Sequence, residues 1–435
     1  MPPSIHPSRL NASIHGTASA FGPIPDSTGM RRLALSAEDK GVRDWLVTAC
    51  EELGCEITVD QMGNIFAKRP GTAPSSANVK PIAIGSHLDT QPAGGRYDGI
   101  LGVLSGLEVL RTLNDHKINT YLPITLVNWT NEEGARFPGA MMSSGVWSQQ
   151  SSTNLEAAWA VKDTEGMTVK QALIDTGYLG PVPCSYKENE LDAHFELHIE
   201  QGPLLERASA KIGVVTSVQS MTWYEIRVHG IEGHSGTAPM PTRSDALVTA
   251  CLLIAAVRDA ARDTTLGVAT VGVIKSATQS QATIPSDVTF IIDIRASTDA
   301  LVAQLSTDVF RRFDTIIAHE ANSTRYETIR TWSLPESLFD PTLISCVRES
   351  ALAHCEPSEI LDMKSGAGHD SAWTSKVIPT TMIFVPSKDG VSHHPDEYTS
   401  PEHCALGAQV LLESVLRYDE LVRMSMEDPE PEHEA

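Results

Sequence analysis

Short apolar runs alternate with longer amphipathic stretches along most of the chain. Helical spacing fits Ala37–Leu53, with Ser36 as the N-cap and Gly54 as the stop signal, and also fits Gly99–Leu113. Apolar runs of strand length stand at Ile82–Ile84, Ile124–Trp129, His194–Ile199 and Thr381–Val385. Alternation of this kind predicts an α/β fold with a mostly parallel sheet.

The middle of the chain carries a second pattern, in which the predicted elements follow the order β-α-β-β-α-β. These elements are Thr222–His229, Arg243–Arg262, Val268–Ile274, Val288–Arg295, Asp299–Ala321 and Arg325–Thr331. This order is typical of a ferredoxin-like α+β sandwich. Because the larger α/β pattern continues on both sides, the sequence predicts a discontinuous host domain over residues 1–216 and 332–435, with an inserted domain over residues 217–331.

Composition and charge restrict the kinds of partner. The 435 residues are 41% hydrophobic and 20% charged, which is typical of a globular chain. Lys and Arg total 33 against 55 for Asp and Glu, and the resulting net charge of −22 disfavours a nucleic-acid or anionic membrane partner. No apolar run reaches the roughly 20 residues of a membrane span. Seven cysteines without a CxxC pair indicate reduced thiols, so we expect a cytoplasmic protein. The net charge does not exclude a small anionic molecule as the partner, because a local arginine can override it.

Four of the predicted strands end in or lead to clusters of possible metal ligands. In chain order they are His87, Asp89 and Asp98; Glu132 and Glu133; His198; and the pair His393 and His394. Taken singly, such histidines are usually solvated, and an Asp before a helix, such as Asp98, is usually its N-cap. Open α/β sheets nevertheless gather their ligands at the carboxyl ends of the strands, so the four clusters are expected to meet. Imidazoles and carboxylates without thiolates suit Zn²⁺, Mn²⁺, Co²⁺ or Ni²⁺.

The adjacent carboxylates Glu132 and Glu133 are the most informative pair. Neighbouring side chains in a turn point in different directions, so one can bind a metal while the other handles a proton. A metal lowers the pKa of water to about 7, and a nearby glutamate can take and return that proton. The pair therefore favours metal-assisted hydrolysis.

Several long motifs occur in a fixed order between Leu33 and Tyr418. They are GSHLDT with GGRYDG, NEEGARFPG, HIEQGPLLE, GHSGTAPMPTRSDAL, SGAGHD and MIFVPSKDGVSHHPDE. Together they resemble the M20-type metal-dependent amidohydrolases, and most closely the carbamoylase branch with N-carbamoyl-L-amino-acid hydrolase, β-ureidopropionase and allantoate amidohydrolase. His198 in HIEQG favours this branch, because peptidase branches typically carry a carboxylate there.

The resemblance implies a metal-binding catalytic host domain with two divalent metal ions per subunit, and an insert that serves as a lid and dimerisation domain. His87 and His198 would hold one ion, Glu133 and His393 the other, and Asp98 would bridge them. Two-metal hydrolases keep their ions about 3.5–4 Å apart.

Three further assignments concern the same centre. Glu132 would be the general base and acid, and Asp89 would orient His87 from behind. The family motif places its ligand directly after the Ser of S-H-x-P, which favours His393, and His394 is the alternative.

The resemblance also implies substrate contacts. Gln201 would bind the ureido group, and His234 would stabilise the oxyanion, often from the partner subunit of a homodimer. Arg295 would form a fork with the substrate carboxylate, while Gly368 and His369 would line the same end. From the residues alone, Arg295 could equally form a surface salt bridge, His234 could be solvated, and His369 could serve packing.

One position departs from the branch pattern. The sequence reads Ala282-Thr283-Ile284-Pro285 where the branch carries an Asn at the first place, beside the substrate carboxylate. The expected reaction is cleavage of the ureido C–N bond of N-carbamoyl amino acids to amino acid, ammonia and carbon dioxide. An aminoacylase- or dipeptidase-like hydrolase is the first alternative. A catalytically inactive binding or scaffold homologue is disfavoured, because every ligand and the base are present.

Overall fold

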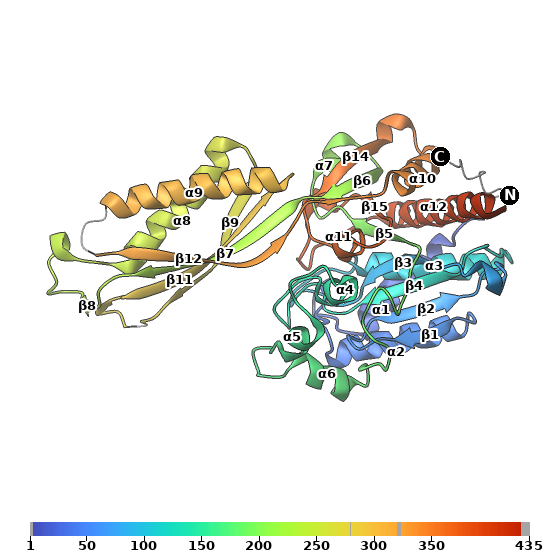
Figure 1. Ribbon diagram of the computed structural model, residues 1–435, viewed down its shortest axis with the longest axis horizontal. Helices are drawn as coiled ribbons and strands as arrows, with labels where there is room; N and C mark the ends of the chain where they lie inside the picture. Colours follow the sequence, from blue (N-terminus) through green and yellow to red (C-terminus); the bar gives the residue numbers. More distant parts are fainter. Residues whose placement is uncertain (1–2, 279, 320–322, 428–435) are drawn as a thin grey trace, which may run out of the picture. The chain divides into compact units, whose positions relative to one another are not determined.

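The computed structural model describes residues 3–278, 280–319 and 323–427. The chain forms two compact units, one of them running from Val218 to Ser337 and the other built from the chain on both sides of it (Figure 1). The predicted insert ended at residue 331, which lies inside strand β12 (Arg325–Leu334). The smaller unit therefore continues to the end of that strand and slightly beyond.

The larger unit is built on a sheet with the order β1-β2-β4-β3-β5-β15-β6-β13, in which β14 also pairs with β6. The central strands β4, β3, β5 and β15 are parallel, whereas the pairs β1–β2, β2–β4 and β15–β6 are antiparallel. The strand bounds are β1 Glu56–Val59, β2 Ile65–Arg69, β3 Ile82–His87, β4 Ile124–Trp129, β5 Ala193–Ile199, β6 Ile212–Val218, β13 Ser337–Leu338, β14 Ile360–Ser365 and β15 Thr380–Val385. The four predicted host strands are these central strands, so the parallel character is confirmed at the centre of the sheet.

Helices cover both faces of this sheet. Helices α1, α3, α10 and α12 share one hydrophobic core with Ile82 and Ile84 of β3, and α4, α5 and α6 share the other with Ala83. Burial of β3 on both faces explains its continuous apolar run. The helix bounds are α1 Pro7–Ala20, α2 Ala37–Glu51, α3 Ile100–Asp115, α4 Met142–Ser148, α5 Leu155–Ala160, α6 Val169–Thr176, α7 Leu204–Ala208, α10 Pro341–Leu352, α11 Asp370–Thr374 and α12 Pro401–Glu427.

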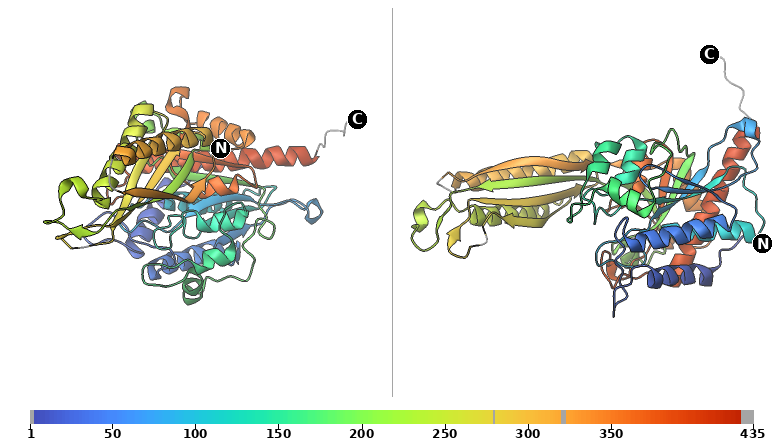
Figure 2. Two further views of the ribbon diagram at one scale, coloured as in Figure 1. Left: turned by 60° about the vertical axis from the view of Figure 1, so that its left-hand side comes forward. Right: turned by 90° about the horizontal axis from the view of Figure 1, so that it is seen from below.

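The smaller unit has the predicted β-α-β-β-α-β order. Its antiparallel sheet runs β12-β7-β11-β9, and α8 and α9 pack side by side on one face of it (Figures 1 and 2). Burial alternates along β11, so that Phe290, Ile292 and Ile294 join the core under the helices. The bounds are β7 Ser220–His229, β8 Gly233–His234, α8 Ala246–Thr264, β9 Val268–Ser276, β10 Thr283–Ile284, β11 Asp287–Ala296 and α9 Asp299–His319. The end predicted for the last helix, Ala321, lies outside the described residues.

Within the described ranges, no helix has the length and apolar character that crossing a membrane requires.

Candidate metal centre

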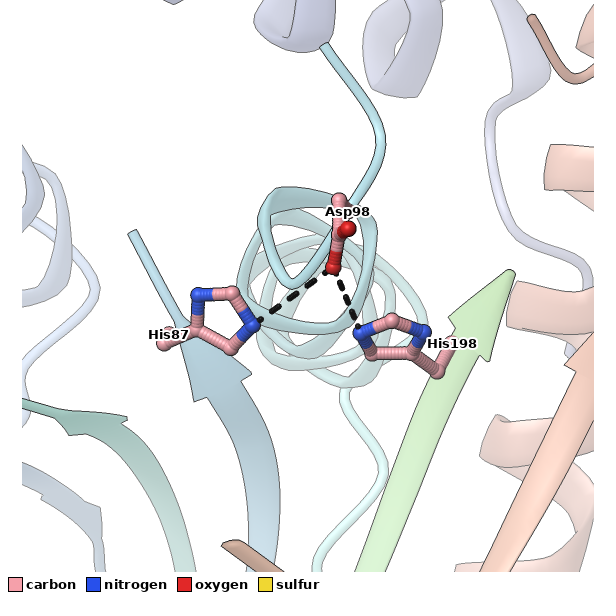
Figure 3. Close-up of side chains that lie close together, drawn as sticks. All are labelled: His87, Asp98 and His198. Carbon is pink, nitrogen blue, oxygen red and sulfur yellow. Dashed lines mark ion pairs between the residues drawn. The ribbon is translucent and has the colours of Figure 1, made fainter. Parts of the chain in front are cut away.

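Two histidines and one aspartate meet where β3 and β5 end. His87 is the last residue of β3, and His198 lies one residue before the end of the neighbouring parallel strand β5. The Nε2 atoms of His87 and His198 lie 3.8 and 3.1 Å from Oδ1 of Asp98, which precedes α3 (Figure 3). The chain leaves β3 toward β4 and returns to β5 on the other side, and ligands gather at such a switch point of an open sheet.

Backbone carbonyls orient both rings. Nδ1 of His87 lies 2.9 Å from the carbonyl oxygen of Asp89, and Nδ1 of His198 lies 2.8 Å from that of Ile199. A hydrogen bond at Nδ1 leaves Nε2 available as a metal ligand. Asp89 was expected to orient His87, and the contact that the structure shows between them is made by the main-chain carbonyl of Asp89. The Asp89 carboxylate instead accepts the backbone N–H groups of Glu132 and Glu133, both at 3.3 Å.

A second group of ligands shares the same aspartate. Nε2 of His393 lies 3.3 Å from Oδ2 of Asp98 and 3.4 Å from Oε2 of Glu133. The neighbouring His394 points elsewhere, because its Nδ1 accepts the backbone N–H of Asp396 at 3.1 Å. The structure therefore brings His393, and not His394, to Asp98 and Glu133.

The charges at this centre fit divalent cations. Burial, together with the charge of Asp98, raises the pKa of Glu133 to about 8. Burial raises the pKa of Glu132 well above its ordinary value, with Asp370 as the next cause. Burial lowers the pKa of His198, but the hydrogen bond and charge of Asp98 outweigh it and raise that pKa to about 9. The raised pKa values mean that this cluster of carboxylates and imidazoles is stabilised by added positive charge. A bound divalent cation would supply that charge.

Gly99 allows this close packing. Its φ is +67°, and a Cβ there would lie 2.3 Å from the ring of His87. Gly99 also occupies the N-cap position of α3, without a side-chain cap. The capping role considered for Asp98 is therefore wrong, because its carboxylate faces the histidines.

Gln201 lies beside the metal centre, and one of the two polar atoms of its side-chain amide has no hydrogen-bond partner among the described residues. Its Nε2 donates to Oδ2 of Asp98 at 2.7 Å and to the hydroxyl of Ser392 at 3.2 Å. The carboxylate fixes which end of the amide carries nitrogen. Its Oε1 is buried and accepts no hydrogen bond from any residue that the structure describes.

The smaller unit holds three of the positions singled out in the sequence. His234 on β8 is exposed, and its Nδ1 accepts the backbone N–H of Gly236 at 3.0 Å. Arg295 on β11 donates through Nε and Nη2 to the carboxylate of Asp293, at 2.9 and 2.7 Å. Ala282 is exposed and accepts the backbone N–H of Ser235 at 2.9 Å. In this structure Arg295 thus forms a salt bridge, as the alternative interpretation of the sequence expected.

His369 is buried against His198. Its ring packs edge-on at 4.5 Å between centroids, and its Nε2 lies 2.9 Å from the hydroxyl of Ser365. Burial and the neighbouring His198 lower the pKa of His369 to about 3, so it is neutral. Gly368 precedes it in the loop between β14 and α11. Substrate contact by this pair stays a prediction, since the described contacts of His369 are with the protein.

Three contributors lack a sequence signal of their own. Gln91 donates to Oε2 of Glu133 at 2.7 Å, and the Ser392 hydroxyl donates to Oδ2 of Asp98 at 2.9 Å. Glu397 accepts the backbone N–H of Asp98 at 3.0 Å. Ser392 and Glu397 stand in the SHHPDE segment, but no spacing rule connects them with a residue near position 98.

A two-unit α/β protein whose sheet carries this shared histidine–carboxylate cluster at its carboxyl edge has the architecture of a metal-dependent hydrolase. The model of the family described as "Peptidase family M20/M25/M40" matches residues 83–417. The chain belongs to this family.

Relatives of known name cover nearly the whole chain. An "N-carbamoyl-L-amino-acid amidohydrolase" of Rhizobium meliloti is 40% identical over 91% of this chain and 92% of its own length. An "N-carbamoyl-L-amino acid amidohydrolase" of Geobacillus stearothermophilus is 35% identical over 89% and 93%. A solved amidase of the "hydantoinase/carbamoylase family" from Burkholderia multivorans superposes with a TM-score of 0.83 at 42% identity, over 96% of this chain and 98% of its own. The predicted branch is therefore confirmed.

Proposed function

We propose that this protein is an N-carbamoyl-L-amino-acid amidohydrolase that uses two divalent cations. It is a hydrolase of C–N bonds other than peptide bonds, as its named relatives are. The observation that carries the two-cation proposal is the sharing of Asp98 between two ligand groups, His87 with His198 and Glu133 with His393. Bound there, Zn²⁺, Mn²⁺, Co²⁺ or Ni²⁺ would act as Lewis acids that polarise the ureido carbonyl and lower the pKa of the attacking water.

The residues then divide the remaining work. Glu132, whose pKa burial raises above its ordinary value, takes the proton of the water and returns it to the leaving nitrogen. Hydrolysis of the ureido group yields the free amine and carbamic acid, which breaks down to ammonia and carbon dioxide. Nδ1 of His234 is an acceptor, so its neutral ring carries the proton on Nε2 and can donate it in a hydrogen bond to the developing oxyanion.

Gln201 supports a ureido substrate in particular. Its buried Oε1 can accept an N–H of the carbamoyl group, a donor that an acetyl group lacks. Arg295 would bind the substrate carboxylate with the fork that now holds Asp293. This arrangement favours carbamoyl over acyl amino acids.

His234 and Arg295 cannot reach one small substrate from the same chain. In the two-stranded sheet of β8 and β10, His234 pairs with Thr283, which lies four residues before Asp287 at the start of β11. Arg295 lies near the other end of β11. Eight residue steps of β-strand between Asp287 and Arg295 span about 26 Å. If both act at one centre, they come from different chains, which supports a homodimer with the insert reaching into the partner's site.

The smaller unit has an apolar edge suited to such a dimer. Leu247, Val248, Cys251 and Leu252 form an exposed stripe on α8 at helical spacing. Next to this helix, β9 is an edge strand among the described strands and exposes further apolar side chains, namely Val268, Val273 and Ile274. We propose a second copy of this chain as the partner of this edge.

A substrate panel tests the activity. Enzyme reconstituted with Mn²⁺, Co²⁺ or Zn²⁺ is offered N-carbamoyl-L-amino acids, carbamoyl-β-alanine, allantoate and N-acetyl amino acids, and ammonia or free amine is measured. We expect the N-carbamoyl-L-amino acids to give the highest kcat/KM. A clear preference for acetyl substrates, or no turnover with any metal, would contradict the proposal.

Mixing two inactive variants tests the shared site. His234→Ala and Arg295→Ala homodimers should each be nearly inactive. After subunit exchange, half of the dimers are mixed and each holds one intact site, so about a quarter of wild-type activity should return. Failure to recover activity in verified mixed dimers would place both residues in one chain or outside the reaction.

A further inference from the structure

Glu397 is a buried carboxylate to which the proposed reaction gives no task. It is 4% exposed, and its Oε1 accepts the backbone N–H groups of Tyr97 and Asp98, both at 3.0 Å. Its Oε2 lies 3.1 Å from the hydroxyl oxygen of Ser392. A single side chain therefore joins two segments that are far apart in sequence, since Asp98 precedes Glu397 by 299 residues.

The space around this carboxylate is closely fitted. A Cβ added to Gly95 would lie 2.1 Å from Oε1 of Glu397. The loop before Asp98 thus lies directly against the carboxylate, and a glycine is needed for that approach. The contact is a built arrangement and not a chance approach of two surface groups.

Both segments that Glu397 joins carry proposed metal ligands. The Ser392 hydroxyl lies between two carboxylates, 3.1 Å from Oε2 of Glu397 and 2.9 Å from Oδ2 of Asp98. The next residue, His393, has a φ of +55° and a half-exposed side chain. A non-glycine residue in that backbone region keeps its conformation only where its surroundings hold it. The turn that closes with the N–H of Glu397 on the carbonyl of His394, at 3.0 Å, supplies that anchor.

We propose that Glu397 is a positioning residue that holds the carboxylate of Asp98 and the loop of His393 in one arrangement, and thereby sets the affinity for the cation bound between them. The inference rests on the proposed two-cation centre. Partners behind metal ligands commonly change metal affinity or activity by 10- to 100-fold when they are removed.

The chain offers a matched control for the loss of a buried carboxylate. Asp419 on α12 is 7% exposed and accepts the backbone N–H groups of Tyr121 and Leu122, at 2.9 and 2.7 Å. These two residues precede β4, at the end of the sheet opposite to the metal centre. Asp419→Ala therefore removes the same kind of interaction as Glu397→Ala, without touching the ligands.

The experiment titrates metal-free wild-type protein, Glu397→Ala, Glu397→Gln and Asp419→Ala with Co²⁺, followed by visible absorption and calorimetry. In Glu397→Ala, we expect one of the two binding events to weaken at least tenfold, with kcat reduced and KM changed less than threefold. Asp419→Ala should lower the melting temperature by a similar amount but keep both affinities within twofold. Glu397→Gln keeps an oxygen for the two backbone N–H groups and should recover most of the affinity.

Each result decides the question. Wild-type affinities in Glu397→Ala, or an equal loss in Asp419→Ala, would overturn the positioning role. If Glu397→Ala does not fold, Ser392→Ala is the test, with the same weakened event expected and wild-type affinity counting against the proposal. Failure of the wild-type protein to bind Co²⁺ at all would instead refute the two-cation centre itself.

Discussion

Replacing Glu132 by glutamine separates proton transfer from metal binding. The side chain is 7% exposed, and its Oε2 lies 3.5 Å from Nε2 of His87, beside the ligands but outside the two groups that share Asp98. Glutamine preserves the shape and the carbonyl oxygen but cannot accept a proton. The variant should therefore keep its metal ions and lose the general base.

The magnitude follows from the role of the group. A positioned general base contributes roughly 10²- to 10⁴-fold in rate. At 1.36 kcal/mol for each factor of ten, Glu132→Gln should raise the activation free energy by about 2.7–5.4 kcal/mol. Burial and the neighbouring Asp370 raise the pKa of Glu132, which is the direction that a group accepting a proton from water requires.

The assay pairs kcat on an N-carbamoyl-L-amino acid with metal content by mass spectrometry. The neighbouring Glu133→Gln serves as the control, because Glu133 contacts His393 as a proposed ligand and its loss should reduce metal content as well as rate. If Glu132→Gln kept kcat within tenfold of wild type at full metal content, the assignment of the base would be wrong.

Three further predictions concern the same centre. Gln201→Leu loses one buried acceptor, so kcat/KM on carbamoyl substrates should fall roughly three- to tenfold relative to acetyl substrates, and an unchanged ratio would contradict the ureido contact. Gly99→Ala places a Cβ where φ is +67°, and urea unfolding should show a loss of about 1–3 kcal/mol together with weaker Mn²⁺ binding; wild-type behaviour would argue against the close fit. Without metal, the pKa of Glu133 is raised to about 8 and those of His198 and His393 to about 9, so the folded protein binds extra protons and its stability falls as pH rises from about 6.5 to 9. Metal binding needs deprotonated ligands, so the melting-temperature difference between Mn²⁺-loaded and EDTA-treated protein should widen over that range, and a constant difference would refute this linkage.

The central strands could be predicted because burial on both faces gives them continuous apolar runs. Every residue of β3 and β4 is buried, and the predicted range of β4 agrees with the structure at both ends. Other elements lack such a signal. The last four residues of strand β14, which has the sequence ILDMKS, alternate between exposed and buried positions, and α1 carries three Ser, one Thr and one Gly among its 14 residues. Helix α1 buries Leu10, Ile14, Thr17 and Ala18, which follow the helical period, but only two of these four are large apolar residues and the signal is weak.

The candidate ligands could be predicted because each carries its own chemistry and lies at or beyond the end of a predicted strand. The supporting contacts could not. Glu397 acts on backbone N–H groups, and the carbonyl of Asp89 orients His87, so neither interaction depends on a recognisable pair of side chains. The salt bridge between Arg295 and Asp293 joins two residues on the same face of one strand. Many surface salt bridges have this spacing, so the pattern did not distinguish this pair.

The position of Cys251 has a practical use. Among the described cysteines it is the exposed one, while Cys50, Cys55, Cys184, Cys346, Cys355 and Cys404 are buried. Because the proposed dimer covers the apolar stripe of α8, a maleimide dye should label Cys251 in the separated subunit and much more slowly in the dimer. The rate of labelling would therefore report subunit dissociation as the protein is diluted, without any engineered tag.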